Sequence, residues 1–108
     1  MSIFRFKSRE TGDLVMLAQH GKRMLEILGK DPSAPGIIQP HEMAAATQAL
    51  REAAAQEEAE QKRQIALAQA QGEPAPSFDV VSLRTRTKPF IEMMQRCQQA
   101  DVAIVWGV

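Results

Sequence analysis

The sequence predicts an α+β fold: a small antiparallel sheet, built from an N-terminal hairpin and a C-terminal strand, covered by three helices. Residues at both ends of the chain alternate between two faces with the period of a half-buried strand. Between them, three segments place apolar residues at helical spacing, and the middle one is long and rich in Ala, Gln and Glu. At 108 residues, we expect one domain spanning residues 1–108.

The N-terminal hairpin is expected at Ile3–Lys7 and Leu14–Leu17. In the first segment Phe4 and Phe6 point one way and their neighbours point the other. The segment Thr11–Asp13 contains a Gly-Asp turn signal. Leu14–Leu17 fits either a strand or the first turn of a helix, and its position after the turn favours the strand.

The first helix is expected over His20–Leu28, with Gly29 as the residue that ends it. Residues 31–36 contain two prolines and a glycine and predict a rigid loop. The apolar pair Ile37 and Ile38 is expected to anchor this loop to the core.

The second helix is expected to open at Pro40 and to continue to about Gln71 without Gly or Pro. Its apolar face fades after residue 55, so the part at about 55–71 is predicted to be an arm that projects or meets a partner. Residues at about 72–79 are rich in Pro and Gly and predict a flexible linker.

The third helix is expected to be capped by Ser82, and a terminal strand is expected over Asp101–Val108. Pro89 interrupts the helical pattern, so the helix either kinks there or begins near Thr87. The predicted core consists of Phe4, Phe6, Leu14, Met16, Leu25, Leu28, Leu50, Leu83, Phe90, Met94 and Trp106.

The charge balance argues against a dedicated nucleic-acid-binding protein, because 13 basic and 13 acidic residues cancel. A net charge of zero also permits oligomers. Cys97 is the single cysteine, so an intrachain disulfide is excluded. The N-terminal segment does not read as a signal peptide, and no apolar run approaches the roughly 20 residues of a membrane span. We therefore expect a cytoplasmic protein without membrane attachment.

Motifs for catalysis, metals or nucleotides are incomplete. His41-Glu42 opens like a zinc-protease signature, but Ala45 stands where the second histidine is needed. Cys97 follows two methionines at helical spacing, which suits ordinary core packing better than a copper site. An enzyme would need His20, His41 and Cys97 to converge with a carboxylate, and this hypothesis ranks last. No cofactor and no metal are expected.

A basic face is the first candidate binding site. Arg5 and Lys7 share one face of the first strand, and Arg84, Arg86 and Lys88 open the last helix. If the fold joins these segments, they form a site for a small anion or a phosphorylated ligand. The alternative is a solvated face, or one that pairs with the glutamates of the long helix.

The long helix is the second candidate site. The leading functional hypothesis is a non-enzymatic protein-interaction module, with self-association as one option. The hypothesis depends on the zero net charge and on an arm without an evident partner inside the chain. The residues expected to make this contact are Met43, Leu50, Glu57, Glu58, Ile65 and Leu67.

Several segments together resemble a known family. They are residues 4–8, 12–17, 36–38, 82–86, 89–94 and 105–106, in this order along nearly the whole chain. The chain resembles a family of small, mostly proteobacterial proteins catalogued as domain of unknown function 1840. The resemblance implies a bacterial cytoplasmic protein, and it supplies no activity, ligand or catalytic residue.

Overall fold

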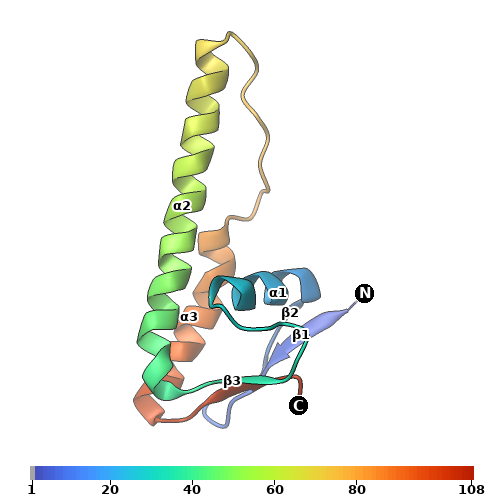
Figure 1. Ribbon diagram of the computed structural model, residues 1–108, viewed down its shortest axis with the longest axis vertical. Coiled ribbons are helices and arrows are strands. Elements are labelled where there is room, and N and C mark those ends of the chain that lie inside the picture. The colour runs from blue at the N-terminus through green and yellow to red at the C-terminus, as the bar shows by residue number, and fades with distance from the viewer. Residues whose placement is uncertain (1) are drawn as a thin grey trace.

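The computed structural model describes residues 2–108 and confirms the α+β class. Within these residues the elements are β1 (Ile3–Phe6), β2 (Leu14–Leu17), α1 (Ala18–Ile27), β3 (Gly36–Ile38), the short 3-10 helix η1 (Pro40–Glu42), α2 (Met43–Ala70), α3 (Leu83–Ala100) and β4 (Ile104–Trp106). The strands lie at one end of the molecule, and α2 extends away from them (Figure 1).

Two small antiparallel sheets, β1–β2 and β3–β4, are joined by a single bridge. The Lys7 backbone N–H donates to the Val105 carbonyl at 2.8 Å, and the Val105 N–H donates back at 2.9 Å. The strands therefore follow the order β2, β1, β4, β3. The backbone pairing between the first and last strands is limited to this bridge.

The strand β3 is an addition to the predicted architecture. The sequence pattern suggested only an anchor at Ile37 and Ile38, but Gly36–Ile38 pairs along its whole length with β4. Gly36 lies opposite Trp106, and a Cβ at Gly36 would clash with the Trp106 indole ring. The strand begins with a glycine because the indole needs that space.

The helix α1 ends at the predicted glycine. Gly29 has a φ of 73°, its N–H donates to the Glu26 carbonyl at 3.0 Å, and the Lys30 N–H donates to the Leu25 carbonyl at 2.9 Å. This pair of bonds satisfies carbonyls that the end of a helix leaves free. The helix begins at Ala18, directly after β2.

The long helix starts through one 3-10 turn at Pro40–Glu42 and ends at Ala70. At its start, the Glu42 carboxylate accepts from the Gln39 backbone N–H at 2.9 Å and from Lys30 Nζ at 2.8 Å. The hydrogen bond from Lys30 is the largest of the effects that lower the pKa of Glu42. These contacts fasten the base of α2 to the loop that follows α1.

The helix α3 begins at Leu83 rather than near Thr87, with Ser82 as its cap. The Thr85 N–H donates to Ser82 Oγ at 3.1 Å. Pro89 lies inside the continuous helix. The helix ends at Asp101, whose φ of 57° is left-handed.

The predicted terminal strand is shorter than expected. The sequence pattern placed it over Asp101–Val108, whereas β4 covers only Ile104–Trp106. Its first residues are taken up by the end of α3, where the Val102 N–H donates to the Cys97 carbonyl at 3.0 Å.

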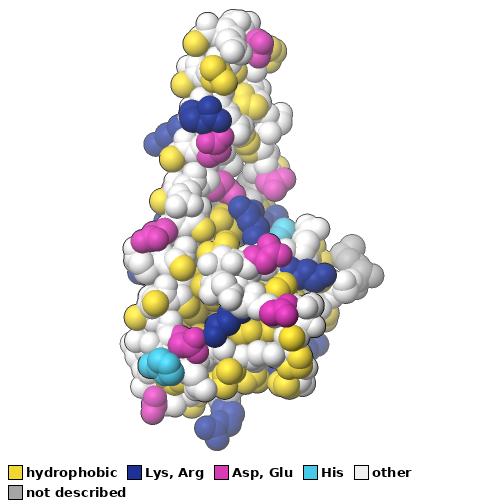
Figure 2. Space-filling model, viewed as in Figure 1, with side chains coloured by type: hydrophobic (Ala, Val, Ile, Leu, Met, Phe, Trp, Pro, Cys, Tyr) yellow, Lys and Arg dark blue, Asp and Glu magenta, His cyan; other side chains and the backbone are white. Residues whose placement is uncertain are grey.

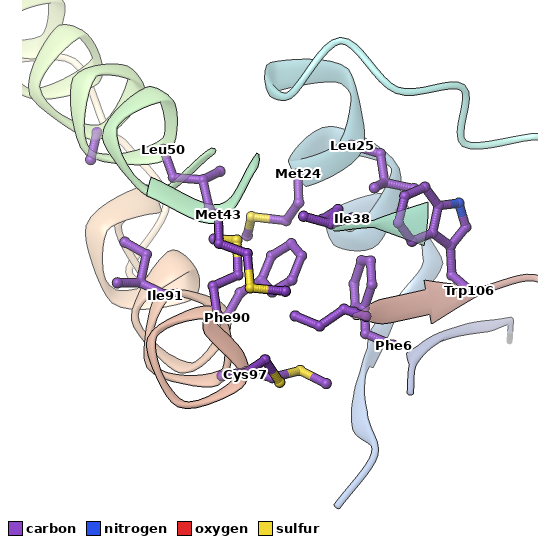
Figure 3. Close-up of a cluster of buried hydrophobic side chains, with 14 of the residues drawn as sticks. Phe6, Met24, Leu25, Ile38, Met43, Leu50, Phe90, Ile91, Cys97 and Trp106 are labelled. Atoms are coloured by element: carbon purple, nitrogen blue, oxygen red, sulfur yellow. The ribbon is translucent and has the colours of Figure 1, made fainter. Parts of the chain in front are cut away.

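The core lies between the sheets and the helices α1, α2 and α3. Phe6 stacks on Phe90 with ring centroids 4.4 Å apart and meets the edge of Trp106 at 6.0 Å (Figure 3). Every residue of the predicted core is buried in this cluster or packs against it. The cluster also contains residues that the core prediction omitted, namely Met24, Ile38, Met43, Ala54, Ile91, Met93, Cys97 and Ile104.

The molecule is elongated. Its Cα radius of gyration is 16.1 Å and its extents are 53 × 30 × 21 Å, whereas a compact chain of this length has a radius of about 13 Å. The second half of α2 accounts for the difference, because it extends beyond α1 and α3 and only the returning chain between α2 and α3 accompanies it (Figure 1).

Candidate interaction surface

The outer face of the β1–β2 hairpin is apolar and open to solvent. Ile3 pairs with Leu17 and Arg5 pairs with Val15 across the two strands, so these four side chains share one face. The exposed fractions of Ile3, Val15 and Leu17 are 54%, 44% and 39%. The opposite face of the hairpin carries Phe4, Phe6, Leu14 and Met16 toward the core. Apolar side chains therefore occupy both faces of these strands.

The same outer face continues across the bridge into the second sheet. Val105 is opposite Lys7, which directly follows β1, and opposite Ile37 in β3, so all three point to the outer side. Ile37 is 40% exposed, and Val105 is half-buried. We call Ile3, Val15, Leu17, Ile37 and Val105, with Arg5 and Lys7 among them, the open sheet face. In Figure 2 apolar side chains gather at the end of the molecule that carries the strands.

Two cations lie within the open sheet face. Arg5 Nη1 is 3.2 Å from Asp13 Oδ2, and both side chains are well exposed. Lys7 Nζ donates to the Val108 backbone oxygen at 2.8 Å. An exposed ion pair of this kind contributes about 0–1 kcal/mol, so these charges remain free to exchange partners.

The predicted basic face does not form as one surface. Arg5 belongs to β1 and Lys7 directly follows it, whereas Arg84 and Lys88 line a separate hollow between α2 and α3, where Arg51 and Glu92 join them. The two groups line different hollows. Arg86 lies half-buried on the same helix as Arg84.

Arg84 pairs with a glutamate of the long helix, as the alternative interpretation of the basic residues allowed. Its guanidinium donates two hydrogen bonds to Glu58, at 2.9 and 2.7 Å. The hydrogen bonds from Arg84 lower the pKa of Glu58 and raise the pKa of Arg84. The sequence suggested one basic surface because all five residues carry positive charge. In the fold, Arg5 and Lys7 lie at the first strand and the other three lie on α3.

Two residues of the predicted interaction helix lie in the core. Met43 and Leu50 have no exposed surface, so a partner cannot reach them. Their assignment to an interaction surface is therefore wrong. The apolar residues at the base of α2 that suggested a contact face pack instead into the core of the same chain.

The second half of α2 has partners within the chain, contrary to the expectation that it lacks them. The Glu57 carboxylate accepts from the Leu83 backbone N–H at 2.9 Å and from Arg23 at 3.2 Å, so it joins three helices. Ala68 is 7% exposed. Of the two apolar residues predicted for contact, Ile65 is half-buried and Leu67 is 48% exposed.

Near the tip of α2, charged side chains pair along the helix itself. Arg63 donates to Glu60 at 2.9 and 2.6 Å, and Gln64 donates to it at 3.0 Å. These hydrogen bonds lower the pKa of Glu60 to about 2. This part of the arm is a solvated polar surface and offers only Leu67 as a large exposed apolar side chain.

The residues considered for chemistry lie on different elements. His20 belongs to α1, His41 belongs to η1, and Cys97 is fully buried in α3 with its thiol 3.1 Å from Ser8 Oγ. Within residues 2–108, no three His, Cys, Asp or Glu side chains gather closely enough to hold a metal ion. No helix in the same span is long and apolar enough to cross a bilayer.

The sequence did not predict the open sheet face. Leu14–Leu17 is apolar at every position, a pattern that is typical of a strand covered on both faces. A chain that has three helices on one side of its sheet leaves the other side uncovered. The apolar residues of alternate positions must then be exposed.

Comparison with known proteins gives one match. A family model described as Domain of unknown function (DUF1840) matches residues 2–106, which is nearly the whole chain. No curated protein and no solved structure matches the chain.

Proposed function

This chain belongs to the DUF1840 family, and we propose that it is a non-enzymatic interaction module that binds a second copy of itself through the open sheet face. The proposal places the module in a bacterial cytoplasm, where a buried unpaired thiol such as Cys97 stays reduced.

The observation that carries the proposal is the exposure of Ile3, Val15, Leu17 and Ile37 on one continuous face. Isolated apolar residues on a surface need no explanation, but several exposed apolar residues on one sheet face are typical of an interface. Covering this face removes apolar area from water, which is the main driving force of association.

A second copy suits this face because its charges are self-complementary. Arg5 and Asp13 lie side by side there with opposite signs. In a two-fold dimer each residue meets its equivalent set, so Arg5 of one copy can pair with Asp13 of the other. A net charge of zero adds no long-range repulsion between copies.

Val15→Glu tests the proposal by sedimentation equilibrium over a wide concentration range. The new carboxylate would lie opposite Arg5 within the hairpin, so the monomer can accommodate it. In an apolar interface it would be desolvated, and we expect association to weaken by at least about tenfold. The wild-type chain should rise in mass from monomer to dimer.

Leu67→Glu is the matched control, because it makes the same change at an equally exposed position on the arm. We expect this variant to dimerise like the wild type. A wild-type chain that stays monomeric throughout would refute self-association. If Leu67→Glu lost the dimer and Val15→Glu kept it, the interface would lie on α2 and not on the open sheet face.

A further inference from the structure

We infer that a pocket beside the open sheet face binds a small organic anion with an apolar body. The pocket has a volume of about 440 Å³, within the usual range for small-molecule sites. Its walls come from three parts of the chain: β1, the loop at residues 32–35, and the segment Trp106–Val108. The pocket shares Ile3, Arg5 and Lys7 with the open sheet face, but the inference does not rest on the proposed self-association.

The ionisable side chains that line the pocket, Arg5 and Lys7, are both cationic, and no Asp or Glu side chain is among its walls. The other pockets found around the structure mix both signs: Lys30 with Glu42, for example, or Arg84 with Glu92. An anion therefore enters this pocket without meeting an acidic side chain.

Both cations keep free hydrogen-bond donors. The Lys7 ammonium has three N–H groups and gives one to the Val108 backbone oxygen at 2.8 Å. Arg5 has five and gives one to Asp13 at 3.2 Å. The bound Val108 oxygen shows that an acceptor oxygen fits beside Lys7, and a ligand oxygen can share or replace it.

The remaining walls are mainly apolar and include one unused donor. Ile3, Phe4 and Pro35 line the pocket together with Trp106. The Trp106 indole N–H is buried and has no acceptor within residues 2–108. Figure 3 shows this nitrogen on the edge of the ring that faces away from the core cluster. The nitrogen is covered, so a ligand gains this bond only with a small shift of the surrounding chain.

These features select the ligand class. Inorganic phosphate would pair with the cations but leave the apolar walls exposed to water. A neutral apolar molecule would cover the walls but leave the cations without an anion. A carboxylate or sulfonate on a short apolar body satisfies both.

The chain carries its own reporter for this pocket, because Trp106 is the single tryptophan and there is no tyrosine. Trp106 fluorescence is followed while sodium hexanoate, 1-hexanol or sodium phosphate is added to the full chain. We expect hexanoate to change the emission saturably and at lower concentration than either comparator. The titration is made at a protein concentration at which sedimentation shows a monomer, which separates this test from self-association.

The variant Arg5→Gln with Lys7→Gln keeps polar side chains and removes both charges. We expect it to weaken hexanoate binding by at least about tenfold and to leave the response to 1-hexanol unchanged. The control, Arg84→Gln with Lys88→Gln, removes two cations from the other hollow and should bind hexanoate normally. Urea unfolding verifies that both variants are folded.

Three results would overturn the inference. They are no saturable response to hexanoate, equal responses to hexanoate and 1-hexanol, or an equal loss in the control variant. A response to phosphate that matches hexanoate would also refute it, because the apolar walls would then contribute nothing.

Discussion

At the scale of single residues, two glycines allow aromatic side chains to reach the backbone. Gly21 is buried in α1, and a Cβ there would lie 2.5 Å from the Cβ and Cγ atoms of Phe4. Gly36 leaves space for the Trp106 indole in the same way. These close approaches seat β1 under α1 and β3 beside β4, and thereby fix the orientation of the open sheet face.

The substitution Gly21→Ala places two effects in opposition. Alanine favours a helix over glycine by about 1 kcal/mol, whereas overpacking costs about 1–3 kcal/mol. The atoms in the way form the rigid stem of Phe4 rather than the end of a flexible chain. We therefore expect a net loss of about 1 kcal/mol in the free energy of unfolding, measured by urea denaturation.

Gly12→Ala serves as the control, because a Cβ there meets nothing within 4 Å. We expect this variant to match the wild type or to gain slightly in stability. If Gly21→Ala proved more stable than the wild type, the packing of Phe4 on α1 would be wrong.

Sequence reasoning at this scale identified burial better than exposure. Alternation and helical spacing showed that Phe6, Leu25 and Phe90 lie inside, because burial of apolar area dominates folding. The same patterns could not show that Ile3 and Val15 are exposed, since exposure depends on whether another element covers the sheet.

At the scale of elements, Glu57 is the residue that joins the arm to the domain. Its side chain is 21% exposed and contacts both Arg23 of α1 and the first N–H of α3. Glu60, one turn further along, pairs only with side chains of its own helix. The two side chains are chemically identical, but Glu57 connects α2 to α1 and α3, whereas Glu60 bonds only within α2.

Replacing each glutamate with alanine separates these roles. Glu57→Ala leaves the partly buried Leu83 N–H without its acceptor, and we expect a loss of about 1–3 kcal/mol in the free energy of unfolding. Glu60→Ala changes helix propensity equally and should have no measurable effect. Urea denaturation gives both values, and faster amide exchange at Leu83 in Glu57→Ala alone would locate the change.

Equal losses in the two variants would show that Glu57 is an ordinary surface residue. The arm would then be held by its apolar contacts alone.

Local sequence signals predicted where helices begin and end, whereas long-range packing determined features such as the strand β3. Gly29 and Ser82 were recognisable because capping depends on neighbouring residues. The strand β3 was not recognisable, because three residues that begin with glycine carry no periodic pattern and form a strand only beside β4. Pro89 fits within α3 although the pattern left its place open.

At the scale of the whole molecule, three helices cover one side of the sheets and leave the other side open. The charges illustrate why this could not be predicted from the sequence. The acidic residues Glu57 and Glu58 pair with α1 and α3 inside the chain, whereas the sequence suggested that they meet a partner. We propose the open sheet face as the surface for a partner, whereas the elongated arm keeps its own polar side chains in water.

The most direct test of self-association follows methyl NMR signals of the full chain as its concentration rises. Because the open sheet face is the proposed contact, the methyl signals of Ile3, Val15, Leu17 and Ile37 should shift together and reach a plateau, while that of Leu67 stays in place. Signals that do not move with concentration, or a shift confined to Leu67 and its neighbours on α2, would contradict the account.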